Sequence, residues 1–147
     1  MKQYNEYRDK LISVDVAILA ESVGYDVYGP ECFTMTGDVP KDAAHIYDEW
    51  SGMIADGNDF LCYRPTITGL QKWLREEHRI HVFIGFRVNL QKFDSYAYPL
   101  DMKAKDHYAE RTLQKFRDQE LYDNYEDALE AGVRGGLQLL LKVNNQN

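Results

Sequence analysis

The side chains best suited to chemistry are basic, and they lie in and beside one predicted helix. Lys72, Arg75 and Arg79 fall on one stripe at helical spacing, and Arg64 comes just before the helix begins. Ammonium and guanidinium groups arranged in this way can bind phosphates or an acidic protein surface. A solvated helix face, paired with nearby carboxylates, explains the same pattern more simply. We therefore treat Arg64, Lys72, Arg75 and Arg79 as a candidate binding face.

Two groups of residues have some of the side chains that metal ions use, but neither has a full ligand set. His78 and His81 flank a junction between a helix and a strand, and no third ligand follows at an obvious spacing. Asp42, His45 and Glu49 share one face of a predicted helix, as a divalent-ion site would require. Acidic residues are dense throughout this half of the chain, so we expect no metal site and no other cofactor.

The sequence contains no catalytic motif. Gly-x-Ser-x-Gly, His-Glu-x-x-His, a phosphate-binding loop and Gly-x-Gly-x-x-Gly are all missing. Neighbouring carboxylates such as Glu76 and Glu77 follow one another along a helix and do not converge on one point. We expect no catalytic residues and a protein that is not an enzyme, unless distant segments assemble a site that motifs do not reveal.

The cysteines and the beginning of the chain predict a cytoplasmic protein. Cys32 and Cys62 are the only cysteines in 147 residues, which is too few for a disulfide framework and typical of a reducing compartment. We expect two buried thiols, with a disulfide between them as the alternative. Residues 1–10 are polar and do not resemble a signal peptide, and no apolar stretch is long enough to span a membrane.

The formal net charge of −7 is unevenly distributed. Residues 1–63 carry 4 basic and 12 acidic side chains, residues 64–117 carry 11 and 6, and residues 118–147 carry 2 and 6. An acidic chain is a poor candidate for charge-driven binding to nucleic acid or to anionic membranes. The basic middle leaves one local face open for an acidic partner, or else it complements the acidic ends within the fold.

The first half of the chain alternates helical and strand patterns. A helix is predicted over 13–23, with Ser13 as its N-cap and Gly24 just after its end. Residues 31–36 and 60–63 have strand composition. Between these strands, the apolar residues of 41–50 recur at helical spacing, which predicts a second helix.

The second half begins with the best-marked helix, over 66–79, and continues with a hairpin. Residues 80–88 alternate as a strand with one apolar face, and 95–102 are expected to form the antiparallel return. Pro99 favours an edge strand or a bulge for this return. Residues 103–119 are expected to be partly helical and exposed, and Asn124 is expected to cap a helix over 125–142.

Two glycines inside the last predicted helix indicate tight packing. Gly132 and Gly136 lie four residues apart on one face, and each costs about 1 kcal/mol of helix propensity. Close approach of another backbone would compensate this cost. The order of elements predicts an α+β fold in which helices pack on one face of a small antiparallel sheet. We expect a single domain over residues 1–147, with insertions at 38–58 and 101–119.

The run over 62–82, CYRPTITGLQKWLREEHRIHV, resembles a group of small proteins encoded by phages, prophages and other mobile elements of Bacteroides-like gut bacteria. That group commonly has Cys-x-x-Pro-Thr, then Leu-x-Gln-Lys-Trp-Leu-Arg-Glu-x-His, then a strand. Residues 24–33 resemble its Gly-Phe-Asp…Cys-Phe segment, and residues 125–132 its closing Tyr-Glu-Glu-Ala-Leu-Glu-x-Gly helix. The resemblance implies a mobile-element origin and implies no particular activity.

Tyrosine content adds a further indication of function. Eleven tyrosines are many for 147 residues, and several fall in irregular segments, as is typical of interaction surfaces; the alternative is that they seal a small core. We therefore predict a non-catalytic accessory protein that binds a protein partner or forms a homo-oligomer. The alternative is a nucleic-acid or nucleotide binder that uses the basic face together with Tyr96 and Tyr98.

Overall fold

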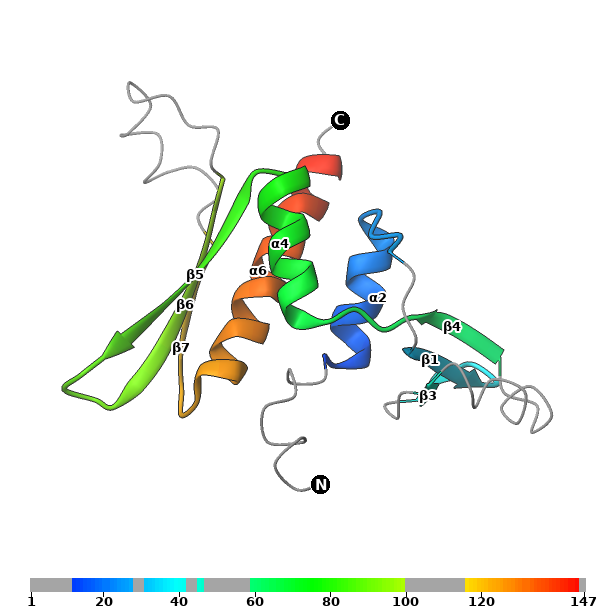
Figure 1. The fold of residues 1–147 in the computed structure, drawn as a ribbon, viewed down its shortest axis with the longest axis horizontal. Coiled ribbons are helices and arrows are strands. Elements are labelled where there is room, and N and C mark those ends of the chain that lie inside the picture. The colour runs from blue at the N-terminus through cyan, green and yellow to red at the C-terminus, as the bar shows by residue number, and fades with distance from the viewer. Residues whose placement is uncertain (1–11, 28–30, 42–44, 47–58, 100–115, 146–147) are drawn as a thin grey trace. The chain divides into compact units, whose positions relative to one another are not determined.

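A computed structural model of the chain describes residues 12–27, 31–41, 45–46, 59–99 and 116–145 (Figure 1). The described residues divide into two compact units, one within Leu11–Thr66 and the other within Ile67–Asn147. Each unit contains its own antiparallel sheet and at least one helix. The α+β class and the antiparallel pairing are thus confirmed, with two small sheets in place of the single sheet that the pattern predicted.

The first unit is built around one central strand. β1 (Glu31–Thr36) pairs with β2 (Val39–Pro40), β3 (His45–Ile46) and β4 (Asp59–Tyr63), all antiparallel. The helix α2 (Val14–Ser22) packs near β4. The predicted helix and the two predicted strands of this unit are therefore confirmed.

One prediction for the first unit is wrong. Residues 41–50 were expected to form a helix, but His45 and Ile46 form β3 and pair with Cys32 and Glu31 of β1. The rest of that segment lies outside the described residues, apart from Lys41. Helical spacing of apolar residues did not decide the structure here, because the edge of β1 offers backbone partners that a local pattern cannot reveal.

The second unit has a three-stranded sheet with two helices on one face (Figure 1). β5 (Ile80–Arg87), β6 (Lys92–Pro99) and β7 (Phe116–Tyr122) lie in that order. The helices α4 (Ile67–Glu77) and α6 (Tyr125–Asn145) pack against this sheet and against each other. Helices on one face of an antiparallel sheet are the predicted arrangement.

The glycines of α6 allow the helices and the sheet to approach closely. A Cβ built on Gly132 would lie 2.7 Å from Cγ1 of Val82, and one on Gly136 would lie 2.9 Å from Cδ1 of Leu74. The approaching groups are side chains of β5 and α4, where the sequence had led us to expect another backbone. Leu70, Leu74 and Val82 are buried in this core.

Two further expectations for the second unit need correction. The strand that contains Pro99 is the central strand, not an edge, and Pro99 is tolerated because it is the last residue of β6. The bulge expected as the alternative to an edge position is present in β6 as a register irregularity, but it lies between Phe93 and Ser95, on the side of β7, and not at Pro99. Residues 116–119, expected to be partly helical, belong to β7, and residues 103–115 lie outside the described part of the chain.

The beginning of α6 is capped as predicted. The backbone N–H of Asp127 donates to Oδ1 of Asn124 at 2.8 Å, and Nδ2 of Asn124 donates to the carboxylate of Asp127 at 2.8 Å. This reciprocal pair satisfies one of the N–H groups that a helix leaves without an internal partner. Ser13 occupies the corresponding position of α2 in an extended conformation, but its side chain makes no capping hydrogen bond. Gly24 has a φ of +100°, as its place after α2 predicted.

Candidate functional site

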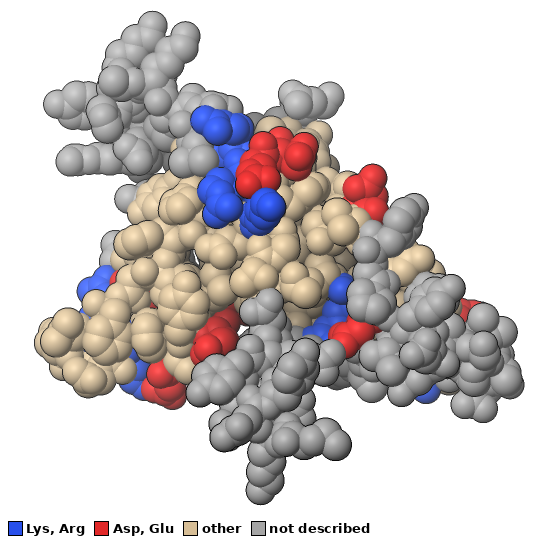
Figure 2. All heavy atoms as spheres, viewed as in Figure 1, with Lys and Arg blue, Asp and Glu red and all other residues tan. Residues whose placement is uncertain are grey.

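The basic residues of α4 form an exposed group with two acidic neighbours. Lys72 and Arg79 are exposed, and Arg75 is partly exposed. Nη2 of Arg75 lies 3.9 Å from Oε1 of Glu76, which is a loose surface ion pair. Figure 2 shows blue and red side chains side by side in this part of the surface. Lys72 and Arg75 of α4, with Arg79 two residues after its end, thus form a basic group with acidic side chains among them.

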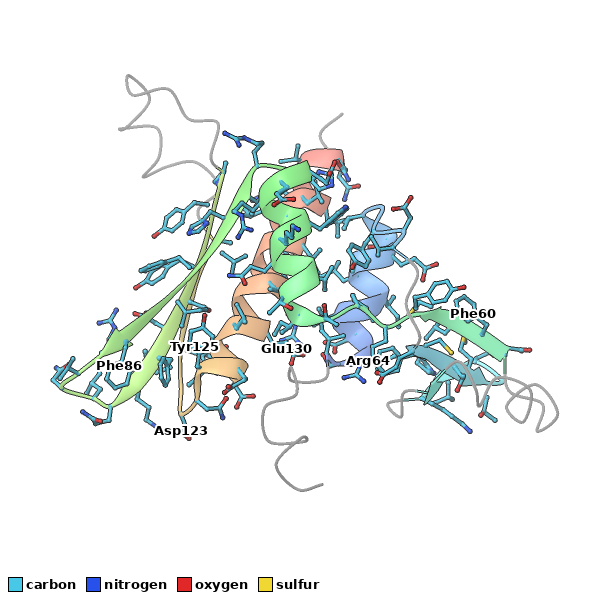
Figure 3. All side chains as sticks on the ribbon, viewed as in Figure 1. Phe60, Arg64, Phe86, Asp123, Tyr125 and Glu130 are labelled. Atoms are coloured by element: carbon cyan, nitrogen blue, oxygen red, sulfur yellow. The ribbon has the colours of Figure 1, made fainter. Side chains whose placement is uncertain are left out.

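Arg64 does not belong to this group. It lies in the first unit, with only 4% of its side chain exposed, and it forms an ion pair with Glu31 of β1. Its backbone N–H donates to the Glu31 carbonyl at 2.9 Å, and its guanidinium lies 6.0 Å from the centre of the Phe33 ring. Arg64, which is labelled in Figure 3, is therefore a buried structural cation.

The two basic residues of the β5–β6 hairpin are each paired with a carboxylate. Nε of Arg87 donates to Oδ2 of Asp94 at 2.9 Å, and Lys92 pairs with Asp123. The hydrogen bond to Asp94 raises the pKa of Arg87 above its usual value. Since each cation has an acidic neighbour, the hairpin does not extend the basic stripe of α4.

The tyrosines of β6 lie on the sheet face that α4 and α6 leave uncovered. Val82 and Ile84 point toward Gly132 of α6, so their neighbours along β5 point to the other face. Tyr96 pairs with Phe83 in the register and Tyr98 with His81, which places both tyrosines on that other face. The basic stripe and the two tyrosines are therefore on opposite sides of the sheet and do not form one groove.

The uncovered face carries an aromatic surface. The rings of Tyr96 and Tyr98 are nearly parallel with centroids 6.1 Å apart, and the ring of Phe83 lies 5.9 Å from that of Tyr96. Phe83 is 49% exposed. We call Phe83, Tyr96 and Tyr98 the aromatic face. Such a surface can contact apolar side chains or stack on planar groups.

A buried carboxylate lies beside the aromatic face. Asp94 is 5% exposed, and its Oδ2 accepts hydrogen bonds from Arg87 and from the hydroxyl of Tyr96, the latter at 2.8 Å. Gly85 is its cross-strand partner, and a Cβ at Gly85 would overlap Oδ1 of Asp94. A shallow hollow of about 560 Å³ opens above these residues. The carboxylate holds Tyr96 and Arg87 in place, so this face has a fixed shape.

The end of the β5–β6 hairpin is apolar as well. Phe86 is 47% exposed, Val88 71% and Leu90 50%. The ring centroids of Phe86 and Phe93 are 4.8 Å apart, and those of Phe93 and Tyr125 are 6.0 Å apart; Phe86 and Tyr125 are labelled in Figure 3. We call Phe86, Val88 and Leu90 the hairpin tip. An exposed cluster of large apolar side chains is typical of a surface that contacts another molecule.

β5 is also an edge strand. Only β6 pairs with it among the described residues, and it contains neither Pro nor Lys, two residues that commonly protect such edges. Nε2 of Gln71 donates to the Val82 carbonyl at 3.3 Å, which covers the first part of the edge. Along β5, the backbone N–H and C=O groups of every second residue point away from β6. Since the Val82 carbonyl points away from β6, those of Ile84 and Phe86 do so too.

The structure describes His45, His78 and His81 among the residues considered for metal binding. The ring of His78 makes an edge-to-face contact with Trp73 at 4.3 Å, and His81 lies on β5. His45 is in β3, whereas Asp42 and Glu49 lie outside the described residues. Within the described ranges, no group of three or more His, Cys, Asp or Glu residues could hold a metal ion.

The two cysteines are buried thiols on neighbouring strands of the first unit. Neither takes part in a disulfide, and both are at most 2% exposed. Burial, with smaller effects from Glu21 and Cys32, raises the pKa of Cys62 to about 12. A thiol with such a pKa stays protonated near neutral pH, so Cys62 is not a nucleophile there.

The aromatic face and the hairpin tip were not selected from the sequence. Phe83 was assigned to the polar face of β5, although a large aromatic residue among His81, Gly85 and Arg87 was a signal that this face is not simply solvated. The exposure of Phe86 and Val88 depends on how far along the hairpin α6 packs on the sheet, which the local pattern cannot reveal.

Comparison with known proteins adds no assignment. No protein-family model matches the chain, and neither a curated protein nor a solved structure matches it significantly. None of the helices in the described part of the chain has the length and apolar character needed to cross a membrane.

Proposed function

We propose that this chain is a non-catalytic interaction protein that binds protein through its second unit. The observation that carries the proposal is the exposure of large apolar side chains on both faces of the β5–β6 hairpin. Phe83 is exposed on the uncovered face, and Phe86 and Val88 at the hairpin tip. Exposed apolar clusters rimmed by polar residues are typical of contact surfaces.

The partner that fits best presents a strand with alternating apolar side chains. The edge of β5 offers outward backbone groups at Ile84 and Phe86, which a second strand can pair with. A second copy of the chain supplies such a strand, since β5 carries the same alternation itself. A different protein with an extended apolar segment could supply such a strand as well.

The polar groups near the aromatic face support a binding role over a catalytic one. Arg87 and the hydroxyl of Tyr96 both donate hydrogen bonds to Asp94, so these polar side chains of the hollow are engaged with one another. The two buried thiols support a place in a reducing cytoplasm. The resemblance of residues 62–82 to proteins of mobile elements supports an accessory role in such an element.

The proposal is tested by substituting the hairpin tip and following association. Wild-type chain, Phe86→Lys and Ile18→Lys would be compared by sedimentation velocity over a range of concentrations, and by capture from a bacterial lysate. Ile18 is the matched control, because it is an exposed apolar residue of the first unit, at 37%. We expect Phe86→Lys to weaken association about tenfold and Ile18→Lys to leave it unchanged.

Two outcomes would overturn the proposal. The first is a wild-type chain that sediments as a monomer at every concentration and captures nothing from the lysate. The second is association that Phe86→Lys and Ile18→Lys weaken equally, because contact would then not depend on the hairpin.

A single-stranded nucleic acid is the second candidate partner. The nearly parallel rings of Tyr96 and Tyr98 would stack on bases, and this pair is the observation that favours it. The cations of α4 lie on the other side of the sheet, which favours protein over nucleic acid. Fluorescence anisotropy with a single-stranded probe at low salt tests this candidate, because electrostatic binding is strongest there. Undetectable binding would exclude it.

A further inference from the structure

The first unit contains a cavity beside α2 and β4. Its volume is about 300 Å³, at the lower end of the range of small-molecule sites. Ala17 and Glu21 of α2 form one side, the stretch 24–27 forms another, and Phe60 and Tyr63 of β4 form a third. All these residues belong to the unit within Leu11–Thr66.

Aromatic rings form a corner of this cavity. The rings of Phe60 and Tyr63 are 5.0 Å apart and inclined at 64°, so one ring presents its edge to the other. Phe60 is 46% exposed although it is a large apolar side chain, and it stands on β4 in Figure 3. Ring faces carry negative partial charge and attract cations, above all organic ones that shed their water easily.

The polar residues of the cavity are acidic. Glu21 and Asp26 are its charged lining residues, both exposed, and the lining contains no Lys, Arg or His. Residues 11–66 carry ten acidic and two basic side chains, a net charge of −8. One of the two basic residues, Arg64, is buried in its ion pair with Glu31. The unit therefore has negative charge that its own cations leave largely uncompensated.

Two titratable groups report the same negative environment. Burial and the charge of Asp26 raise the pKa of Tyr25, which also lines the cavity. Glu21 contributes to the raised pKa of Cys62, after burial. Burial is the larger cause of both shifts, and the nearby carboxylates act in the same direction, so an additional negative charge is disfavoured in this neighbourhood.

We propose that this cavity binds an organic cation, a substituted ammonium or a guanidinium group. The cation would lie against the rings of Phe60 and Tyr63, with Glu21 and Asp26 supplying the opposite charge. A metal ion fits less well, because two carboxylates beside aromatic rings do not make a ligand set. An anion is excluded by the charge, and a neutral apolar ligand would leave the carboxylates without a role.

The same cation chemistry has two sources, a free small molecule or the side chain of a protein. Calorimetric titration of the full chain with tetramethylammonium chloride tests the first, and titration with an arginine-containing peptide tests the second. tert-Butanol, which resembles tetramethylammonium in shape and has no charge, is the control ligand. We expect binding of at least one cation and none of tert-butanol.

Variants of the cavity sharpen the test. Phe60→Leu keeps an apolar side chain but removes the ring, and we expect it to weaken cation binding about fivefold. Glu21→Gln removes one charge and should weaken binding severalfold. Asp59→Asn is the matched control, since Asp59 is an exposed carboxylate on β4 outside the lining, and it should leave binding within about twofold. Circular dichroism confirms that each variant is folded.

Each contrary result would overturn the proposal. If the folded wild-type chain binds neither cation, the proposal is wrong. Equal binding of tetramethylammonium and tert-butanol would show an apolar cavity without charge selection. Equal weakening by Glu21→Gln and Asp59→Asn would show only a general effect of net charge. None of these results bears on the interaction proposed for the second unit, whose variants lie at the β5–β6 hairpin.

Discussion

Residues 11–66 carry ten acidic and two basic side chains, whereas residues 67–147 carry twelve of each. The first unit combines its excess of negative charge with a cavity that has aromatic walls. The second is electrically balanced and exposes large apolar side chains on a sheet face and a hairpin tip. A cationic ligand suits the first surface, and an uncharged protein strand suits the second.

The interiors of the two units differ in the same way. The first contains the ion pair of Arg64 with Glu31, beside the two thiols. The second also contains a buried carboxylate, Asp94, but where α6 meets the sheet its interior consists of interlocking apolar side chains, with glycines of α6 giving them room. The first unit thus contains a buried cation with its counter-charge, whereas the cation that pairs with Asp94 in the second unit is partly exposed, and the contact of α6 with the sheet there depends on shape. Substitutions of each kind should therefore have unequal effects in the two units.

The largest effect is expected from breaking the buried ion pair of the first unit. Glu31→Gln leaves the cation of Arg64 buried without its counter-charge, which typically costs about 3 to 5 kcal/mol. Since the Glu31 side chain is 15% exposed, we expect the lower end, about 3 kcal/mol. Urea unfolding of the full chain, followed by circular dichroism, measures the change.

The double variant Glu31→Leu with Arg64→Met is the control for this prediction. Replacing both members of a buried pair by apolar residues is often neutral, so the double variant should be more stable than Glu31→Gln. If Glu31→Gln changes the free energy of unfolding by less than about 1 kcal/mol, the pair is effectively solvated and the contrast between the units weakens.

A smaller loss is expected from filling the space at a glycine of the second unit. Gly132→Val places its Cβ 2.7 Å from Cγ1 of Val82 and 3.3 Å from Cβ of Ser95. Overfilling a packed core typically costs about 1 to 3 kcal/mol. We expect about 2 kcal/mol, because the gain in helix propensity over glycine offsets part of the strain. Urea unfolding again measures the difference.

Val82→Ala serves as the compensating change, because it removes the methyl groups that the new side chain meets. The double variant Gly132→Val with Val82→Ala should recover part of the lost stability. Additive losses would show instead that the approach of α6 to β5 is not limited by these two side chains.

The sequence predicted those elements whose information is local. The cap of α6 by Asn124, the boundaries of β1 and the apolar stripe of α4 follow from residue types and spacing. The thiols of Cys32 and Cys62 were likewise predicted as buried and not disulfide-bonded. In each case the deciding contacts are made within a few residues, or depend on composition alone.

Elements whose state depends on distant partners were mispredicted. His45 and Ile46 have helical surroundings in sequence but pair with β1, and Pro99 ends a central strand. Arg64 was grouped with the cations of α4, because nothing local reveals that Glu31, 33 residues away, takes its charge. The exposed ring of Phe86 was missed for a similar reason, since its exposure depends on where the contact of α6 with the sheet ends.

A pH-dependent difference should also separate the two units, because the only cysteines lie in the first. The pKa of Cys62 is raised to about 12 in the folded chain, mainly by burial, whereas an unfolded thiol titrates near pH 8.5. Below about pH 8.5 both states are protonated, and the stability is unaffected by this group. Between that pH and about 12 the unfolded state loses the proton while the folded state keeps it, so folding becomes less favourable as the pH rises.

Between the two pKa values, this single group should lower the free energy of unfolding by about 1.4 kcal/mol per pH unit. Lysines and tyrosines titrate in the same range, so the measurement compares wild type with Cys62→Ala in urea unfolding between about pH 8 and 10.5. The variant starts from a lower stability because a buried side chain is trimmed, but its stability should fall less steeply with pH. Parallel curves would mean that the Cys62 thiol ionises as easily in the folded chain as in the unfolded one, and would contradict a protected interior in the charge-rich unit.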